Sequence, residues 1–426
     1  MRWFRLLIVV ALLPVTPAAA MDSVAAVRAR LETIAGLRIE SGQLMNGKPF
    51  FVLWYSQPTD HHATTSERFE QRITLWHKGF DRPTILQTTG YAGTTGASAA
   101  EPTRLADGNQ LGVEQRFFGR STPASKDWTK LDIWQAATDH HRIVEAFKPL
   151  YGGKWLSTGA SKGGMTSVYH RRFYPTDVDA TIAYVAPQDT VNDQDSYVDF
   201  IQHAGTDRAC NEALRTLQRN ALYRRATLLP KLTQLKLTYE QAYGSADRAF
   251  EAAVLDTPFK FWQYRTQASC LLIPGRNATD QQLFTFIDQI VDWSSYSDAG
   301  VAPYQAYFYQ AAAQLNWPDV SAGTTWLKGL LHYPEAGAAP ATLKAPPKHD
   351  PNAMPDIDRW VRTTASRLLF VYGANDPWSA EQFEPCPHDC HTYVVPAGNH
   401  NATIANLPTA QRTAATALMR GWVSAQ

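Results

Sequence analysis

The sequence predicts an α/β protein in which a mostly parallel sheet is covered by helices on both faces. Three observations support this prediction. Strand-like segments alternate with helical ones, a glycine-rich turn joins one such strand directly to a helix, and the segments nearest the N-terminus show the alternation of half-buried strands at a sheet edge. Between about residues 188 and 348 helical periodicity dominates instead, which predicts an insertion that caps the sheet.

The expected strands are short and bounded by turn residues. They are residues 50–55, 69–75, 84–89, 112–115, 155–157, 181–185, 368–372 and 392–395. Thr129 and Asp132 resemble a capping box that opens a helix ended by Pro149. Two further helices are expected in the sheet-forming part and three in the insertion: residues 165–174, 409–422, 221–237, 246–262 and 281–291.

The N-terminus has the pattern of a signal peptide. Arg2 and Arg5 precede an apolar run that ends in Ala18-Ala19-Ala20. The run is shorter than the roughly 20 residues that span a bilayer, so we expect cleavage after Ala20 and a secreted or periplasmic protein. An uncleaved membrane anchor is the alternative.

The net charge argues against two classes of partner. The formal net charge is +1, and it becomes −1 when Arg2 and Arg5 leave with the signal peptide. Such a balance offers no electrostatic footprint for nucleic acid or for an anionic membrane. No later segment is long and apolar enough to span a bilayer. We therefore expect neither partner, and the oligomeric state stays open.

Four cysteines in an exported chain suggest two disulfides. Four cysteines allow three pairings; a local loop between Cys386 and Cys390 would leave Cys210 for Cys270. A zinc site is the competing interpretation, because His388 and His391 lie beside two of these thiols. The spacing is unlike that of common zinc sites, so no metal is expected.

These observations divide the chain into four parts. Residues 1–20 are expected to be the signal peptide, 21–187 the first part of the sheet-forming core, 188–349 a helical cap domain and 350–426 the second part of the core. The proline- and alanine-rich residues 336–351 resemble the linker that leaves the cap.

A nucleophile motif lies at the glycine-rich turn. Gly159-Ala160-Ser161-Lys162-Gly163 follows a strand and precedes a helix, which is the context in which an exposed serine acts as a nucleophile in the α/β-hydrolase fold. A plain glycine-rich turn that starts a helix is the alternative. The sequence thus predicts an α/β-hydrolase fold with a helical cap inserted between the nucleophile and the catalytic Asp.

The order of candidate triad residues agrees with that fold. Asp376 follows the strand at 368–372, and His400 follows the strand at 392–395, so the chain order is Ser, Asp, His. His400 would act as the base and Asp376 would hold its tautomer. His388 and His391 are rivals, but they precede or begin the last strand. Asp376 could instead form an Asx turn.

The oxyanion of acyl transfer needs two donors. The backbone N–H of Lys162 would be one, and the N–H or hydroxyl of Tyr91, after the strand at 84–89, would be the other. The Lys162 side chain is expected to be solvated. Glu114 and Arg116 are expected to pair with each other and support the site.

Three motifs carry a family resemblance. The segment from Val113 to Ser121, residues 159–166 and Asn375-Asp376-Pro377-Trp378 resemble the secreted bacterial tripeptidyl aminopeptidases of the PS-10 (S37) family. They are similar, more distantly, to the prolyl carboxypeptidase and dipeptidyl peptidase II family. The resemblance implies a serine peptidase that takes short peptides, most often tripeptides, from a free N-terminus, with proline or a small apolar residue before the cut, and that needs no cofactor.

The resemblance also implies substrate contacts. Met165 and Trp378 match positions that line the proline pocket in the prolyl-specific relatives, although both could be plain core residues. Ile404 stands where those relatives have Trp. The substrate ammonium needs a carboxylate, for which Asp189, Asp193 and Asp195 are candidates; a solvated acidic loop is the alternative.

The sequence is compatible with two other functions. An esterase or lipase could use the same Ser161, Asp376 and His400. A catalytically inactive protein could use the cap as a recognition surface, because a fold does not guarantee chemistry.

Overall fold

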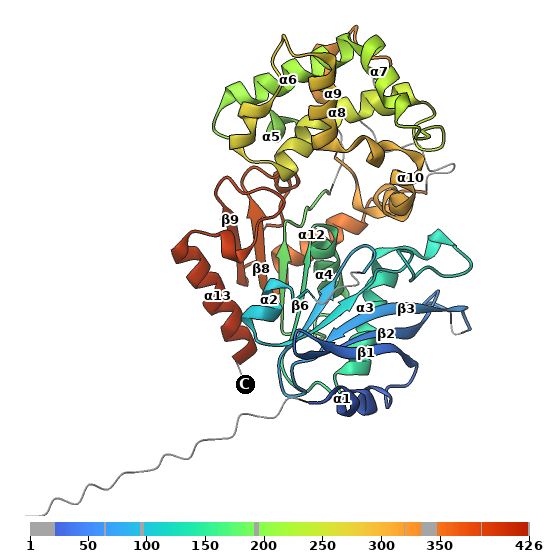
Figure 1. Cartoon of the computed structure of the whole chain (residues 1–426). Helices are drawn as coiled ribbons and strands as arrows, with labels where there is room; N and C mark the ends of the chain where they lie inside the picture. The colour runs from blue at the N-terminus through green and yellow to red at the C-terminus, as the bar shows by residue number, and fades with distance from the viewer. Residues whose placement is uncertain are drawn as a thin grey trace, which may run out of the picture.

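A computed structural model gives the architecture of the chain (Figure 1). It describes residues 22–424 except residue 64, residues 94–97, 191–195, 319, 334–346 and 385. The expected signal peptide and most of the expected linker at 336–351 lie outside the described residues. Within the described residues, no helix combines the length and the apolar character needed to span a membrane.

A nine-stranded sheet forms the base of the molecule, with the strand order β1-β2-β3-β5-β4-β6-β7-β8-β9. The strands are β1 Leu37–Met45, β2 Lys48–Pro58, β3 Arg68–Trp76, β4 Thr84–Thr88, β5 Asn109–Val113, β6 Trp155–Ala160, β7 Ala180–Tyr184, β8 Ser366–Gly373 and β9 His388–Val395. Strands β1, β2, β3 and β5 pair antiparallel, and all later pairs are parallel.

The predicted α/β-hydrolase fold is confirmed. The mostly parallel sheet with an antiparallel edge matches the prediction, and each expected strand is present with small shifts of its ends. Strand β1 was not predicted. None of its residues is buried, and the apolar alternation that starts at Leu37 and Ile39 stops at Ser41, where the register with β2 shifts.

Helices cover both faces of the sheet because side chains alternate along each strand. Leu368, Phe370 and Tyr372 of β8 pack against α4 and α12, whereas Leu369 and Val371 pack against α13. The helices of this part are α1 Val24–Leu31, α2 Glu101–Leu105, α3 Ile133–Phe147, α4 Lys162–Phe173, α12 Ala353–Thr363 and α13 Thr409–Ser424.

The start of α3 differs from the prediction. Thr129 lies in a separate 3₁₀ turn, and the side chain of Asp132 accepts a hydrogen bond from the Gln135 amide to cap the helix. Asp is a strong N-cap residue by itself, so the helix begins one turn later than a capping box at Thr129 would place it.

A helical region lies between β7 and β8 and stands above the carboxyl ends of the parallel strands (Figure 1). We use this name for the described residues from Tyr197 to Leu327. Its helices are α5 Tyr197–His203, α6 Arg208–Tyr223, α7 Arg225–Gln234, α8 Ala246–Tyr264, α9 Asp280–Val291, α10 Asp298–Val301 and α11 Gln305–Gln310. These helices share a hydrophobic core of their own.

Helices α6 and α7 of this region differ from the prediction, and α8 departs from regular geometry. The single helix expected at 221–237 is instead the junction of α6 and α7, which meet at Arg224. Helix α8 contains Pro258, which cannot donate to the carbonyl of Val254. The side-chain amide of Gln218 donates to that carbonyl at 3.2 Å, so the freed acceptor is satisfied.

The structure has both expected disulfides, Cys210–Cys270 and Cys386–Cys390. Within the described residues, no group of three or more His, Cys, Asp or Glu side chains could hold a metal ion. His388 and His391 lie on β9, where His391 pairs with Asp389.

Removing the two disulfides is expected to have unequal effects on stability. The Cys210–Cys270 bond closes a 60-residue separation and the other bond a separation of 4. Chain entropy predicts losses of about 4 and about 2 kcal/mol in the free energy of unfolding when each pair is replaced by serine. Denaturant unfolding of the two double variants measures this. Equal losses, or a larger loss for the short loop, would contradict it.

Candidate active site

Ser161 stands in a strained turn between β6 and α4. Its φ is 55° and its ψ −131°, a conformation that non-glycine residues rarely adopt. Its N–H donates to the Tyr184 carbonyl of β7 at 2.9 Å, which holds the turn against the sheet. This geometry places the serine at the carboxyl end of a central strand, between a strand and a helix, as the motif predicts.

The flanking glycines are required by close backbone contacts. A Cβ at Gly159 would lie 2.2 Å from the Gly163 carbonyl oxygen, and one at Gly163 would lie 2.5 Å from the Thr88 carbonyl oxygen. No side chain fits at either position. The Gly-x-Ser-x-Gly pattern therefore lets the turn, the helix and the end of β4 approach one another.

His400 and Asp376 form a hydrogen-bonded pair. The His400 Nδ1 and the Asp376 Oδ2 are 2.7 Å apart, and the Asp376 side chain is fully buried. The other carboxylate oxygen of Asp376 accepts from the Trp378 amide at 3.1 Å. The Asx turn that was an alternative reading of Asp376 is thus present together with the histidine contact. This pair can orient an imidazole and stabilise its protonated form.

Two backbone N–H groups beside Ser161 have no acceptor in the described part of the chain. They belong to Lys162, in the first turn of α4, and to Tyr91, after β4. A Cβ at Gly90 would lie 2.6 Å from the Gly163 nitrogen, so the loop of Tyr91 is pressed directly onto the nucleophile turn. The two unpaired donors therefore lie on adjoining segments.

The prediction of a solvated Lys162 side chain is wrong. The residue is 2% exposed, and its Nζ donates to the Gly90 carbonyl at 2.5 Å. The ammonium also lies over the rings of Tyr91 and Phe118. Burial lowers the pKa of Lys162 to about 7. The loops of Gly90 and Phe118 cover this side chain, and neither is adjacent to it in sequence.

The predicted pairing of Glu114 with Arg116 is also wrong. Arg116 is fully buried and makes a two-pronged contact with Asp139 of α3, at 2.6 and 2.8 Å. Glu114 instead accepts from backbone amides of Gly93 and Arg120. Since Phe118 follows Arg116 closely, the buried ion pair fixes the loop that covers Lys162.

Breaking this ion pair is expected to destabilise the fold. Burial alone would raise the pKa of Asp139, but the Arg116 charge and hydrogen bonds outweigh it and hold that pKa below its usual value. An Arg116→Met variant leaves a buried carboxylate without its partner, which costs about 3–5 kcal/mol in the free energy of unfolding.

The Arg116 prediction can be checked by denaturant unfolding across pH. A lowered pKa contributes stability at pH values above the usual Asp pKa, and this contribution disappears as pH falls through the folded-state value. The loss in Arg116→Met should therefore shrink in acid. The double variant Arg116→Met with Asp139→Leu should recover part of it. An Arg116→Met protein as stable as the wild type at pH 7 would contradict the account.

Aromatic side chains surround the histidine. The Trp378 ring lies 6.2 Å from His400 and packs edge-on against Phe259 of α8 at 5.3 Å. Tyr264, at the end of α8, also meets His400 edge-on at 6.1 Å. The Trp378 indole N–H has no acceptor among the described residues. Met165 is buried in a cluster with Ile133 of α3 and Tyr169 of α4.

Asp189 lies where the chain leaves β7. It is 3% exposed, and its negative charge helps to raise the pKa of Tyr307 above the usual value, after the larger effect of burial. The ring of Tyr307 packs against Tyr91 at 5.6 Å. The Asp189 charge therefore acts on a tyrosine that packs against Tyr91. The other two candidate carboxylates, Asp193 and Asp195, lie outside the described residues.

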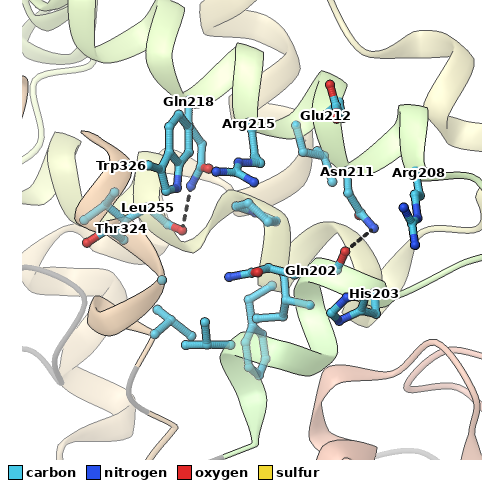
Figure 2. A pocket seen from close by; sticks show the side chains of 17 residues that line it. Gln202, His203, Arg208, Asn211, Glu212, Arg215, Gln218, Leu255, Thr324 and Trp326 are labelled. Carbon is cyan, nitrogen blue, oxygen red and sulfur yellow. Dashed lines mark hydrogen bonds between the residues drawn. The ribbon is translucent and has the colours of Figure 1, made fainter. Parts of the chain in front are cut away.

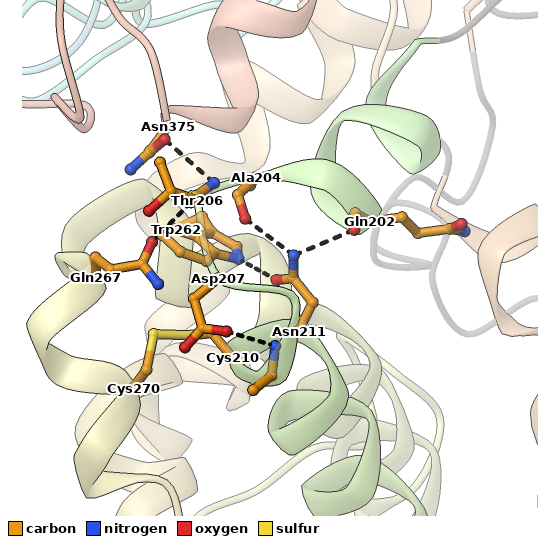
Figure 3. Close-up of a disulfide and its surroundings, with 12 residues drawn as sticks. Gln202, Ala204, Thr206, Asp207, Cys210, Asn211, Trp262, Gln267, Cys270 and Asn375 are labelled. Carbon is orange, nitrogen blue, oxygen red and sulfur yellow. Dashed lines mark hydrogen bonds between the residues drawn. A yellow bond between two sulfur atoms is a disulfide. The ribbon is translucent and has the colours of Figure 1, made fainter.

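The helical region is tied to the loops of the candidate triad. The His400 N–H donates to the carbonyl of Gln263 at the end of α8. In a second link, the Gly205 N–H donates to the Asn375 side chain at 3.2 Å, and Figure 3 shows Asn375 in the surroundings of the Cys210–Cys270 disulfide. Both links join the region to residues at or next to the Asp–His pair.

A pocket of about 260 Å³ opens in the helical region (Figure 2). Its apolar wall includes Leu214, Leu255 and Phe259, and Arg208 and Arg215 lie at its exposed side. Phe259 also packs on Trp378, so the pocket adjoins the aromatic cluster around His400.

Sequence reasoning did not find several residues of this site. Tyr264 and Tyr307 come from the helical region, where no sequence motif marks them, and the sequence predicts a solvated side chain for Lys162, which is buried. The signal that could have found Lys162 is its place inside the glycine-rich turn, where the backbone of neighbouring loops must approach closely.

Comparison with known proteins gives two results at the sequence level. The family model of the PS-10 peptidase S37 family matches residues 20–426. The prolyl tri/tetrapeptidyl aminopeptidase of Streptomyces mobaraensis is 43% identical over 407 residues, which cover 93% of this chain and 84% of that protein.

Solved structures are more distant. The proline iminopeptidase of Mycobacterium smegmatis is 14% identical with a TM-score of 0.38, covering 87% of this chain and 98% of that one. Epoxide hydrolase A of Mycobacterium thermoresistibile is 12% identical with a TM-score of 0.37, covering 86% and 98%. Both are too distant to bear on function.

Proposed function

Because the chain belongs to the PS-10 peptidase S37 family, a family of serine peptidases, we propose that it releases short peptides, most often tripeptides, from the free N-terminus of its substrates. We propose further that it prefers proline or a small apolar residue before the cut. The observation that carries the proposal is the hydrogen-bonded pair of His400 and Asp376, which lies with the strained turn of Ser161 at the carboxyl edge of one sheet.

The proposed mechanism assigns one role to each residue of the triad. Ser161 attacks the carbonyl carbon while His400 accepts its hydroxyl proton. Asp376 holds the imidazole in the tautomer that accepts this proton and stabilises the resulting cation. His400 then donates the proton to the leaving amine, and a water molecule activated by His400 releases the peptide from Ser161.

The N–H groups of Tyr91 and Lys162 are proposed as the oxyanion donors. Both lack an acceptor in the described structure and lie on adjoining segments beside Ser161. Donors fixed in place before the reaction stabilise the negative charge that develops on the carbonyl oxygen.

Substrate contacts are proposed for three further residues. Trp378 packs beside His400, and an aromatic face together with the thioether of Met165 suits a proline ring. Asp189 is proposed to bind the substrate ammonium, since it is a buried carboxylate shortly after β7 whose charge acts on Tyr307, a ring that packs against Tyr91.

Three wider features belong to the proposal. Residues 188–349 would act as a cap domain that limits the number of residues released, because the helical region contacts the loops of Asp376 and His400. The chain would be secreted or periplasmic after cleavage at Ala20, in agreement with its two disulfides. Its partners would be peptides with a free N-terminus, and the chemistry needs no cofactor.

A panel of chromogenic substrates tests the proposed function against an esterase. The p-nitroanilides of Ala-Ala-Pro, Ala-Pro, Pro and N-acetyl-Ala-Ala-Pro are compared with p-nitrophenyl acetate. Fast cleavage of free Ala-Ala-Pro alone among the anilides is expected. Equal cleavage of the acetylated peptide would contradict the proposed ammonium site. Ester cleavage without any anilide cleavage would establish an esterase instead.

A further inference from the structure

Lys162 is a buried lysine without a carboxylate partner among the described residues. Its Nζ contacts the Gly90 carbonyl oxygen at 2.5 Å and lies 5.2 and 4.8 Å from the ring centres of Tyr91 and Phe118. Burial lowers its pKa to about 7, which shows that the surroundings disfavour the charge. A methionine would fill similar space without this cost, so the amine at this position requires an explanation other than stability.

The contact with Gly90 fixes the peptide group that follows it. The C=O of Gly90 and the N–H of Tyr91 belong to one planar trans peptide and point in opposite directions. When Nζ holds the carbonyl on the buried side, the N–H must face the other side. That N–H has no acceptor in the part of the chain that the structure describes.

Gly90 by itself does not hold this peptide in one orientation. Its φ is +71°, in the region that glycine enters freely, and it has no side chain to restrict rotation of the following peptide. The backbone of Gly163 stands so close that no Cβ could be added to provide such a restriction. The Lys162 side chain is the group that reaches the carbonyl.

We propose that the Lys162 side chain is a positioning residue that holds the Gly90–Tyr91 peptide with its N–H directed at the oxyanion. The inference rests on the proposed function, which makes the Tyr91 N–H an oxyanion donor. Lys162 acts through Gly90 and does not touch the substrate with its side chain. The backbone N–H of Lys162 is thus one donor of the oxyanion hole, and its side chain positions the other donor, the N–H of Tyr91.

The first test compares Lys162→Met with Lys154→Met. Losing one oxyanion donor lowers kcat by about 10²–10³-fold, and a misdirected donor is expected to lower it by about 10²-fold, with KM changed by less than about threefold. The control makes the same change at the other end of β6, where Lys154 pairs with Asp179 at 3.1 Å. Its kcat should stay within about threefold of wild type.

Denaturant unfolding of the variants distinguishes a positioning role of Lys162 from a purely structural one. The methionine variant should unfold at a denaturant concentration no lower than the wild type, because it removes a buried charge. A Lys162→Gln variant keeps an N–H donor on a shorter side chain and should have a kcat between those of Lys162→Met and wild type. If the methionine variant does not fold, the glutamine variant carries the test, with an expected loss of about tenfold.

The second readout is affinity for a peptide aldehyde, Ala-Ala-prolinal. Ser161 Oγ forms a bond to the aldehyde carbon, the carbonyl double bond opens to an oxyanion, and the hydroxyl proton passes to His400. The inhibition constant of Lys162→Met should rise by about the same factor by which kcat falls, because both report on the oxyanion.

The outcomes distinguish this inference from the proposed function. Hydrolysis of p-nitrophenyl acetate passes through the same oxyanion, so the variants can be compared even if the wild type cleaves no peptide. A wild-type kcat and aldehyde affinity in Lys162→Met would overturn the inference and leave the peptidase assignment intact. A fall in kcat that is matched by an equal loss in the free energy of unfolding would also overturn it. So would an effect on KM without an effect on kcat.

Discussion

Replacement of Ser161 by alanine is expected to lower kcat for Ala-Ala-Pro p-nitroanilide by about 10⁶-fold, the size of loss seen when the nucleophile of a serine peptidase is removed. The reason lies in the turn between β6 and α4. Its φ of 55° holds the side chain at the edge of the sheet, and alanine can occupy the same backbone without offering an oxygen. KM is expected to stay within a few-fold.

Ser167→Ala is the matched control for this variant. Ser167 lies in α4, the helix that follows Ser161. It is buried, and its hydroxyl shares a hydrogen bond with the Thr88 hydroxyl at 2.7 Å. Its loss should lower the free energy of unfolding by about 1 kcal/mol and leave kcat within about threefold. A fluorophosphonate should label the wild type and Ser167→Ala on Ser161, but not Ser161→Ala. Residual activity above 1% of wild type in Ser161→Ala would exclude this serine as the nucleophile.

The second large effect is expected from Asp376→Asn. The buried carboxylate accepts the Nδ1 hydrogen of His400 at 2.7 Å, which leaves the other ring nitrogen free to act as a base. An asparagine presents its NH₂ group to the ring and favours the opposite tautomer. The expected fall in kcat is about 10⁴-fold, with little change in the backbone.

Asp358→Asn provides the control, because Asp358 lies on α12 and pairs with Arg362 away from the site. Its kcat should match that of the wild type. Fluorophosphonate labelling of Asp376→Asn should slow in proportion to kcat, since both reactions need the same base. An Asp376→Asn protein that keeps more than one tenth of wild-type kcat would show that this carboxylate does not orient the catalytic histidine.

The sheet could be predicted because its strands carry strong patterns. Strand β8 contains the apolar run Leu368–Tyr372, and β4, β6 and β7 are short, mostly buried segments with apolar residues near turn signals. Burial on both faces is what such segments indicate. The exposed edge strand β1 has no such pattern. The local signal that could have found it is Asn46-Gly47, a two-residue turn with positive φ at both residues that joins β1 to β2.

The candidate triad could be placed from chain order alone. Ser161, Asp376 and His400 each follow a predicted strand, and the carboxyl ends of parallel strands share one edge of the sheet. The structure brings Asp376 and His400 into contact and puts Ser161 on a strained turn at the same edge. Their catalytic roles are predictions that Ser161→Ala and Asp376→Asn test.

Partners that lie far apart in the chain could not be predicted. Glu114 and Arg116 are two residues apart, and β5 already ends at Val113, so the chain turns and the two side chains find different partners. The partner of Arg116 is Asp139, on a helix that begins 17 residues later. Tertiary packing, and not spacing in the sequence, determines which charged side chains pair with each other.

The solvation of a lysine also depends on distant segments. At the start of a helix, a lysine is most often exposed, which is why Lys162 was expected in water. The structure covers it with the loops that contain Gly90 and Phe118. Only the close approach permitted by the glycines makes this burial possible.

The central claim is that the protein removes short peptides from the free N-terminus of its peptide substrates. The most direct measurement follows a synthetic peptide of the sequence Ala-Ala-Pro repeated three times, with mass spectrometry of the products over time, beside its N-acetylated form. The account predicts stepwise loss of tripeptides from the N-terminus of the free peptide, and an intact acetylated peptide. Internal cleavage of both peptides at similar rates would contradict it.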